Sequence, residues 1–312
     1  MRLAREMGLV AEWFISCDTG CRECGAVMVG WRDPEVIARV ERLDIAFNVD
    51  GYDRYGISRD HLVRFLSALK PVYEHWSRVT SFDTGNVPTS GRAILAGNHS
   101  GGVGFDALMV LCSLVFDREP PRLAHGMMEQ SLAKIPFANT VFSRMGQFSG
   151  YSRHAEHLLE DERLLLVFPE GPRGSGKLFR ERYQLARFGT GFMRLALKTK
   201  SPVIPFAFVG AEEAFPALAN AKWLAKLFGA SYLPITPQLV PLPLPLSCQV
   251  YYGEPMYFEG TGNESDEVVA ELVSRVRNAV QRMVDRGCLA RPTSFMLQRM
   301  PGEDESLVGG RR

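Results

Sequence analysis

Apolar residues recur at spacings of three and four after Ser58, which predicts an amphipathic helix near the start of the chain. The apolar stripe consists of Leu62, Leu66, Leu69, Tyr73 and Trp76. Ser58 can cap this helix, and Asp60 suits the positive end of its dipole. The following stretch, FDTGNVPTSG, interrupts the helical pattern with glycine and proline. We therefore predict an N-terminal helical region over residues 1–85, with a domain boundary near Asn86.

Beyond this boundary, short apolar runs alternate with helical patterns. The runs that predict buried strands are Ala93–Ala96, Leu164–Phe168, Val203–Val209 and Cys248–Tyr252. The patterns that predict helices between them are Ala107–Phe116 and Phe188–Leu197. Strands and helices in alternation favour an α/β domain, with helices packed on a sheet.

A last helix is predicted from Ser265 onward, because apolar residues again recur at helical spacing. Its stripe consists of Val269, Leu272, Val276, Ala279, Val280 and Met283. The sequence after Arg291 is polar and glycine-rich, so residues 291–312 are predicted to form a loosely ordered tail. The α/β domain then spans residues 86–290.

The composition of the 312 residues is that of an ordinary globular protein, with 46% hydrophobic and 23% charged residues. The net charge of +1 gives no electrostatic reason to expect a nucleic-acid partner. No apolar run suits a signal peptide or a spanning helix. Six cysteines do not suggest a disulfide scaffold, so a reducing cytoplasm is the expected setting.

Two predicted strands end in unusual polar sequences. The first continues into GNHSGGVGFD, residues 97–106, and another into FPEGPRGSGK, residues 168–177. In open α/β sheets, binding and catalytic sites gather at the carboxyl ends of the strands. The sequence therefore predicts that both polar clusters face one crevice.

His99 is the candidate base of the first cluster, because a neutral imidazole accepts a proton near pH 7. A carboxylate on its other nitrogen would fix the tautomer, and Asp106 can reach it across a glycine-rich turn. Two structural alternatives stay open at this point. His99 can be a structural loop histidine, and Asp106 can be the N-cap of the next helix.

The second cluster offers Glu170, Gly171, Arg173 and Lys177. Between residues 173 and 187 the chain has one acidic residue, Glu181, and five basic residues: Arg173, Lys177, Arg180, Arg182 and Arg187. Arginine binds phosphate through two hydrogen bonds, and lysine adds a point charge. This pattern indicates an anion site, and the alternative is a solvated basic loop.

The motifs NHSGGVGFD, FPEGPRGSGK and PVIPFAFVG resemble, in their order, those of the PlsC-like glycerolipid acyltransferases. That family acylates glycerol-3-phosphate or lysophosphatidic acid. The resemblance spans roughly residues 87–255. The stretch GQFSGYSRHAEHLL, residues 146–159, occupies the place of the family's second motif and contributes Arg153. The resemblance implies a mixed sheet flanked by helices.

The resemblance also implies a mechanism. His99 would be the general base on the acceptor hydroxyl, with Asp106 orienting it. The hydroxyl oxygen would attack the thioester of acyl-CoA or acyl carrier protein, and no metal or redox cofactor is implied. The residues expected to bind the substrates are Arg153, Glu170, Gly171, Arg173, Lys177 and Pro205.

The chain departs from the family pattern at two places. The family usually has four residues between the histidine and the aspartate, whereas six intervene here, Ser100–Phe105. The threonine of the family's EGTR motif is replaced by Pro172. Lysophosphatidic acid or a related lysophospholipid is the first expected acceptor, and a neutral glycerolipid is the alternative.

A long uncharged stretch predicts contact with a membrane surface. No charged residue occurs from Leu227 to Gly253, and five prolines exclude a spanning helix there. Just before it, apolar residues lie at helical spacing beside Lys222 and Lys226, which fits an interfacial segment. These apolar residues are Trp223, Leu224, Leu227 and Phe228. The expectation is a cytoplasmic protein attached peripherally to a membrane, and the alternative is a loop packed on the domain.

Three further hypotheses compete with an acyltransferase. Cys17, Cys21 and Cys24 have the C-x3-C-x2-C spacing of iron–sulfur radical enzymes, but Glu23 replaces the aromatic residue usual there, so we interpret them as chance cysteines. A serine hydrolase using Ser100 would lack the G-x-S-x-G elbow. A lipid-binding protein without catalysis would not need both polar clusters.

Overall fold

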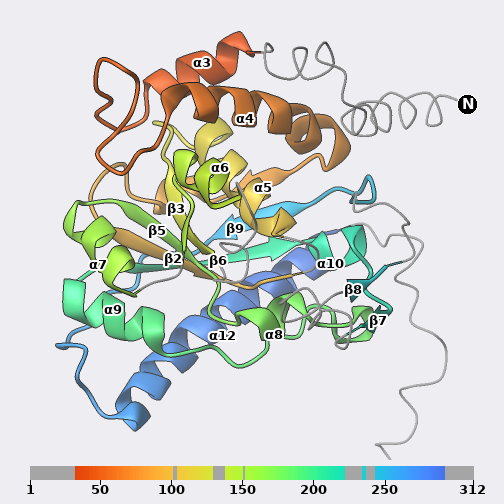
Figure 1. Cartoon of the computed structure of the whole chain (residues 1–312). Coiled ribbons are helices and arrows are strands. Elements are labelled where there is room, and N and C mark those ends of the chain that lie inside the picture. Colours follow the sequence, from red (N-terminus) through yellow and green to blue (C-terminus); the bar gives the residue numbers. More distant parts are fainter. Residues whose placement is uncertain are drawn as a thin grey trace, which may run out of the picture.

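A seven-stranded mixed sheet forms the centre of the molecule (Figure 1). The computed structural model describes residues 32–100, 104–128, 138–149, 152–221, 234–236 and 243–291. In spatial order the strands are β1 (Thr80–Phe82), β9 (Gln249–Tyr252), β6 (Val203–Val209), β2 (Ala93–Gly97), β5 (Leu164–Val167), β3 (Ala124–Met128) and β4 (Phe148–Ser149). The five strands from β6 to β4 run parallel, and β9 lies antiparallel to β6. The fold class is therefore the predicted one.

Helices cover both faces of this sheet (Figure 1). On one face α5 (Phe105–Phe116) packs on the strands, and α3 (Pro34–Glu41) and α4 (Arg59–Pro71) lie outside it. On the other face lie α7 (Ser152–Glu160), α9 (Gly191–Thr199) and α12 (Asp266–Ala290). The shorter elements are a π-helical turn (Val72–Trp76), α6 (Ala138–Arg144), α8 (Pro172–Ser175), α10 (Ala211–Ala214), two 3-10 turns (Thr84–Asn86 and Phe179–Glu181) and the antiparallel pair β7 (Ala219–Asn220) and β8 (Pro234–Ile235).

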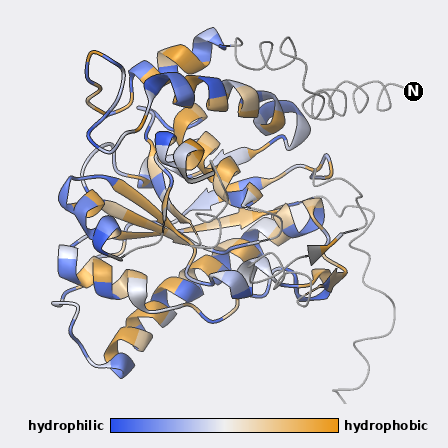
Figure 2. Cartoon of the chain, viewed as in Figure 1, coloured by the Kyte–Doolittle hydropathy of each residue, from blue (hydrophilic) through white to orange (hydrophobic). Residues whose placement is uncertain are grey.

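The core lies between these layers, and the hydropathy of the chain follows them. The central strands are mainly hydrophobic, whereas the helices mix hydrophobic and hydrophilic residues (Figure 2). Every residue of β2 and β6 is buried. Among the described residues, no helix has both the length and the apolar character needed to cross a membrane.

The first predicted helix is confirmed as α4. The Ser58 hydroxyl accepts a hydrogen bond from the His61 amide, and Leu62 and Leu66 of the predicted stripe are buried. The π-helical turn extends this helix to Trp76. The predicted domain boundary near Asn86 falls between β1 and β2. Since β1 pairs with β9, the sheet begins before this boundary.

The four predicted strands are confirmed, and their ends shift by at most one residue. The helices expected around 107–116 and 188–197 are α5 and α9. Within the described residues, the central sheet has three further strands that the pattern did not predict, β1, β3 and β4, and the short pair β7 and β8 was not predicted either. The three N-terminal cysteines, the segment 222–233 with Trp223, and residues 292–312 of the predicted tail lie outside the described residues.

The last predicted helix is confirmed as α12, with Ser265 as its N-cap. Its buried stripe is centred on Val269, Val273, Val276, Val280 and Val284. Near its end, a side chain at Gly287 would place a Cβ 2.7 Å from Val209 of β6. Glycine therefore lets α12 approach the sheet closely, which fixes this helix behind the carboxyl ends of the strands.

Candidate active site

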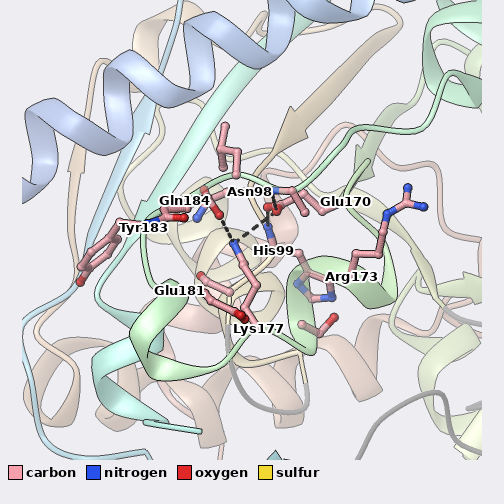
Figure 3. Close-up of polar contacts among 12 residues, drawn as sticks. Asn98, His99, Glu170, Arg173, Lys177, Glu181, Tyr183 and Gln184 are labelled. Carbon is pink, nitrogen blue, oxygen red and sulfur yellow. Dashed lines mark hydrogen bonds and ion pairs between the residues drawn. The ribbon is translucent and has the colours of Figure 1, made fainter. Parts of the chain in front are cut away.

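The carboxyl ends of β2, β5 and β6 lie side by side, because these three strands are parallel neighbours. His99 follows β2, Glu170 follows β5, and Glu212 follows β6. The two polar clusters of the sequence thus meet at one edge, as predicted (Figure 3). The third strand end was not among the predicted contributors.

Asn98 fixes the chain where β2 ends. Its side chain donates to the carbonyl of Phe208 at 2.8 Å and accepts from the Phe208 amide at 2.8 Å. Asn98 is buried, so these two bonds replace the next step of the β2–β6 ladder. The side-chain amide therefore holds the backbone that carries His99.

His99 and Asp106 form a hydrogen-bonded pair. The distance from His99 Nδ1 to Asp106 Oδ2 is 2.7 Å, which is typical of an imidazole–carboxylate bond. The same carboxylate accepts the amides of Ser100 and Ala107, each at 2.8 Å. The N-cap of α5 is Gly104, so the alternative that Asp106 is an N-cap is wrong. Residues 101–103 of the intervening loop lie outside the described residues.

The surroundings of His99 favour its protonated form. Burial of the ring opposes a charge, but the charge and hydrogen bond of Asp106, followed by the charge of Glu170, outweigh burial. The pKa of His99 therefore lies above the ordinary value for histidine. Asp106 is fully buried, whereas 17% of the His99 side chain is exposed. The imidazole is thus held by a buried carboxylate while part of its ring remains accessible to solvent.

Phe168 lies beside the imidazole, a position that its place at the end of a predicted strand did not indicate. The two rings stack with their centroids 4.4 Å apart. Phe168 also packs edge-on against Phe206 of β6. The ring therefore limits the orientations that His99 can take.

Glu170 uses both carboxylate oxygens within the chain. Oε1 accepts the backbone amide of His99 at 2.9 Å, and Oε2 accepts the amide of Ala186 at 2.6 Å. The Lys177 ammonium lies 3.2 Å from Oε2 (Figure 3). Glu170 is buried, so this carboxylate joins the end of β2 to the segment around Ala186.

Two glycines bring the second cluster against the first. Gly171 has φ of 56° and ψ of −147°, a conformation that favours glycine, and it precedes α8. A Cβ on Gly174 would lie 2.8 Å from the carbonyl oxygen of His99. The backbone of α8 therefore lies directly against His99.

The two cations predicted to meet a phosphate differ in exposure. Arg173 is exposed, and its guanidinium donates to the carbonyl of Arg187 at 3.2 Å. The Lys177 side chain is only 8% exposed and lies between the carboxylates of Glu170 and Glu212. Figure 3 shows the Arg173 guanidinium pointing away from Lys177. Arg173 is therefore the cation of this pair that is open to an external anion.

The two remaining predicted residues are Arg153 on α7 and Pro205 on β6. Arg153 is exposed in the first turn of α7, at the same edge of the sheet. Pro205 is buried within β6, level with Ala96 of β2, and its carbonyl accepts the amide of Gly253 at 2.8 Å. Within the described part of the chain, no group of three histidine, cysteine or acidic side chains is arranged to hold a metal ion.

Comparisons with known proteins agree with this fold. A family model described as Acyltransferase matches residues 78–209. An uncharacterized protein of Mycobacterium tuberculosis (strain ATCC 25618 / H37Rv) is 36% identical over 272 residues, which cover 82% of this chain and 74% of the relative. Another mycobacterial relative, from Mycobacterium leprae, is covered over 65% of its length.

Two more distant proteins carry informative names. The human "DGAT1/2-independent enzyme synthesizing storage lipids" is 22% identical over 202 residues, covering 64% of this chain and 59% of the human protein. The crystal structure of the 1-acyl-sn-glycerophosphate acyltransferase PlsC from Thermotoga maritima matches with a TM-score of 0.54 and 19% identity, covering 94% of this chain and all of that chain. The match to PlsC shows a common fold, and the family model together with the mycobacterial relatives shows that the chain belongs to the acyltransferase family.

Proposed function

We propose that this protein transfers a fatty acyl group from a thioester donor, acyl-CoA or acyl carrier protein, to a hydroxyl of a glycerolipid acceptor. The first candidate acceptor is lysophosphatidic acid or a related lysophospholipid. The observation that carries the proposal is the His99–Asp106 pair, 2.7 Å apart, at an edge of the sheet where Arg173 is exposed. No metal or redox cofactor takes part in the proposed reaction.

The geometry of the pair supports general-base catalysis. A neutral His99 that donates from Nδ1 to Asp106 carries its lone pair on Nε2, which can take the proton of the acceptor hydroxyl. The acceptor oxygen then attacks the thioester carbonyl and forms a tetrahedral intermediate. Collapse of this intermediate breaks the carbon–sulfur bond, and the thiolate takes up the proton from the imidazolium. The products are an ester and a free thiol.

Release of free thiol tests this proposal and separates it from its rivals. An acyltransferase releases thiol from acyl-CoA only when an acceptor is present. A serine hydrolase would release it without an acceptor, and a lipid-binding protein would not release it at all. Ser100 is fully buried, which opposes a role as nucleophile.

A neutral glycerolipid is the second candidate acceptor. The name of the human relative refers to storage lipids. Lys177, one of the two cations expected at a phosphate, is buried and already paired with carboxylates. Monoacylglycerol and diacylglycerol therefore belong in the acceptor panel beside glycerol-3-phosphate and lysophospholipids.

Arg173→Ala is expected to distinguish the two acceptor classes. Losing a hydrogen bond to a charged phosphate costs about 2 kcal/mol, or about thirtyfold in kcat/KM, mainly through KM. A neutral acceptor is expected to be affected much less. Arg282→Ala is the matched control, because Arg282 is exposed on α12 and belongs to neither polar cluster. Unchanged kinetics with lysophosphatidic acid would remove Arg173 from the binding site.

We also propose peripheral attachment to the inner face of a membrane, because a lipid acceptor has to be reached at a bilayer. The expected result is co-sedimentation with lipid vesicles, weakened by the double change Leu227→Glu and Phe228→Glu since charges oppose insertion. These two residues lie outside the described residues. Val49→Glu with Val268→Glu is the charge-matched control, because both valines are exposed elsewhere. A wild-type protein that stays wholly in the supernatant would contradict the attachment.

A further inference from the structure

A short backbone segment, residues 183–187, touches three site side chains in succession; we call it the strap. The carbonyl of Gln184 accepts from Lys177 at 3.2 Å, and the amide of Ala186 donates to Glu170 at 2.6 Å. The carbonyl of Arg187 accepts from Arg173 at 3.2 Å. The strap therefore fixes both cations of the second cluster and the carboxylate between the strands.

The outer side of the strap is held by α12. Arg277 donates to the carbonyl of Leu185 at 2.7 Å, and Gln281 donates to the carbonyl of Tyr183 at 3.1 Å. Gln281 also accepts the amide of Leu185 at 3.3 Å. A long helix that packs on β6 thus keeps the strap in place against the site.

Glu212 and Glu213 hold the start of the strap from the end of β6. Glu212 accepts the amide of Tyr183 at 3.3 Å and lies 3.6 Å from the Lys177 ammonium. Glu213 accepts the Tyr183 hydroxyl at 2.8 Å and pairs with Arg291 at 2.7 Å. Both glutamates are buried. Lys177 is therefore enclosed by Glu170, Glu212 and the strap.

We propose that Lys177 is a positioning residue for His99, because its ammonium fixes Glu170 and Glu170 holds the backbone amide of His99. This inference rests on the proposed function, in which His99 is the base. It differs from the substrate-binding role that the family resemblance implies for Lys177. The side chain is only 8% exposed, and two carboxylates and a carbonyl surround its ammonium. An external phosphate would have to displace them.

The charge of Lys177 also acts on the imidazole. The charged groups that face His99 are Asp106 of α5, Glu170 after β5 and Lys177 after α8. The two carboxylates raise the pKa of His99, and Lys177 lowers it. Removing Lys177 therefore makes His99 harder to deprotonate, whereas removing the charge of Glu170 makes it easier. If Lys177 and Glu170 only packed the loop, neither substitution would change the pKa of His99.

Nuclear magnetic resonance titration of the histidine rings measures this effect without any substrate, with His99 assigned by its absence in His99→Gln. Lys177→Met is expected to raise the pKa of His99, because the ammonium that lowers it is lost. Glu170→Gln is expected to lower it, and the double variant is expected to lie between the two. The double variant removes both charges of the Lys177–Glu170 pair, and Glu212 keeps its hydrogen bond from the Tyr183 amide, so this variant tests the proposal even where Lys177→Met does not fold.

The pH profile of kcat/KM is the second measurement of the His99 pKa. Activity falls as the pH drops through the His99 pKa, so the acid limb is expected to move upward in Lys177→Met, with kcat about tenfold lower and KM little changed. Lys198→Met is the matched control, because Lys198 pairs with Glu156 on the surface. A His99 titration unchanged in both single variants overturns the inference. Shifted titrations in a protein that transfers no acyl group would sink the proposed function instead.

Discussion

Replacing His99 with alanine is expected to abolish acyl transfer while the fold survives. The change removes the group that takes the acceptor proton, which costs about a thousandfold or more in kcat. The backbone amide of residue 99 still reaches Glu170, and Asp106 keeps the amides of Ser100 and Ala107. Loss of activity would therefore follow from chemistry and not from unfolding.

The thiol-release assay with acyl-CoA and each acceptor measures this effect, and circular dichroism with thermal unfolding checks the fold. His75→Ala is the control, since the His75 side chain is 80% exposed and remote in sequence from the site. An active His99→Ala protein would show that the acceptor oxygen is deprotonated by another group. The proposed mechanism would then be wrong, although the family assignment would stand.

The sequence predicted the long buried elements because their signal is local. A run such as Val203–Val209 is buried on both faces, so it is apolar at every position. The missed strands lack such a run. Thr80 and Ser81 begin β1, His125 and Gly126 interrupt the apolar pattern of β3, and β4 has two residues. Their pairing is set by the neighbouring strand, and no local pattern records that.

The candidate site was predictable in its parts and less so in its connections. His99 and Glu170 stand out because polar residues directly follow buried strands. Lys177 was grouped with the solvent-facing arginines, because its burial depends on Glu212, a residue 35 positions later that the sheet brings close. Asn98 gave no signal of its own, since its partner is the backbone of Phe208. These contacts depend on the order of the strands in the sheet, and the hydrophobic pattern of the sequence does not predict that order.

The loop between His99 and Asp106 is longer here than in the family pattern. Six residues separate His99 and Asp106, yet the two side chains meet at 2.7 Å. The extra length therefore does not prevent the pairing that general-base catalysis needs. The acceptor panel with Arg173→Ala addresses the identity of the acceptor directly.

Asp106→Asn is expected to be nearly as damaging as the loss of His99. All three partners of the Asp106 carboxylate are donors: the His99 ring and the amides of Ser100 and Ala107. An asparagine has one oxygen, so its NH2 group must face at least one of these donors. If the NH2 group faces His99, the ring is held with Nδ1 as acceptor and Nε2 protonated. That tautomer cannot take the acceptor proton, and in serine proteases the equivalent change costs about ten-thousandfold in kcat.

The measurement is kcat for thiol release, with Asp50→Asn as the control because Asp50 is exposed in the turn before α4. The pH profile of the residual activity gives a second test. Asp106 raises the pKa of His99 by charge and by hydrogen bonding, so its loss is expected to move the acid limb to lower pH while the plateau falls. A variant that keeps wild-type kcat and an unmoved acid limb would show that Asp106 only packs the loop. His99 would then act without an orienting partner, and the 2.7 Å contact would have no part in the reaction.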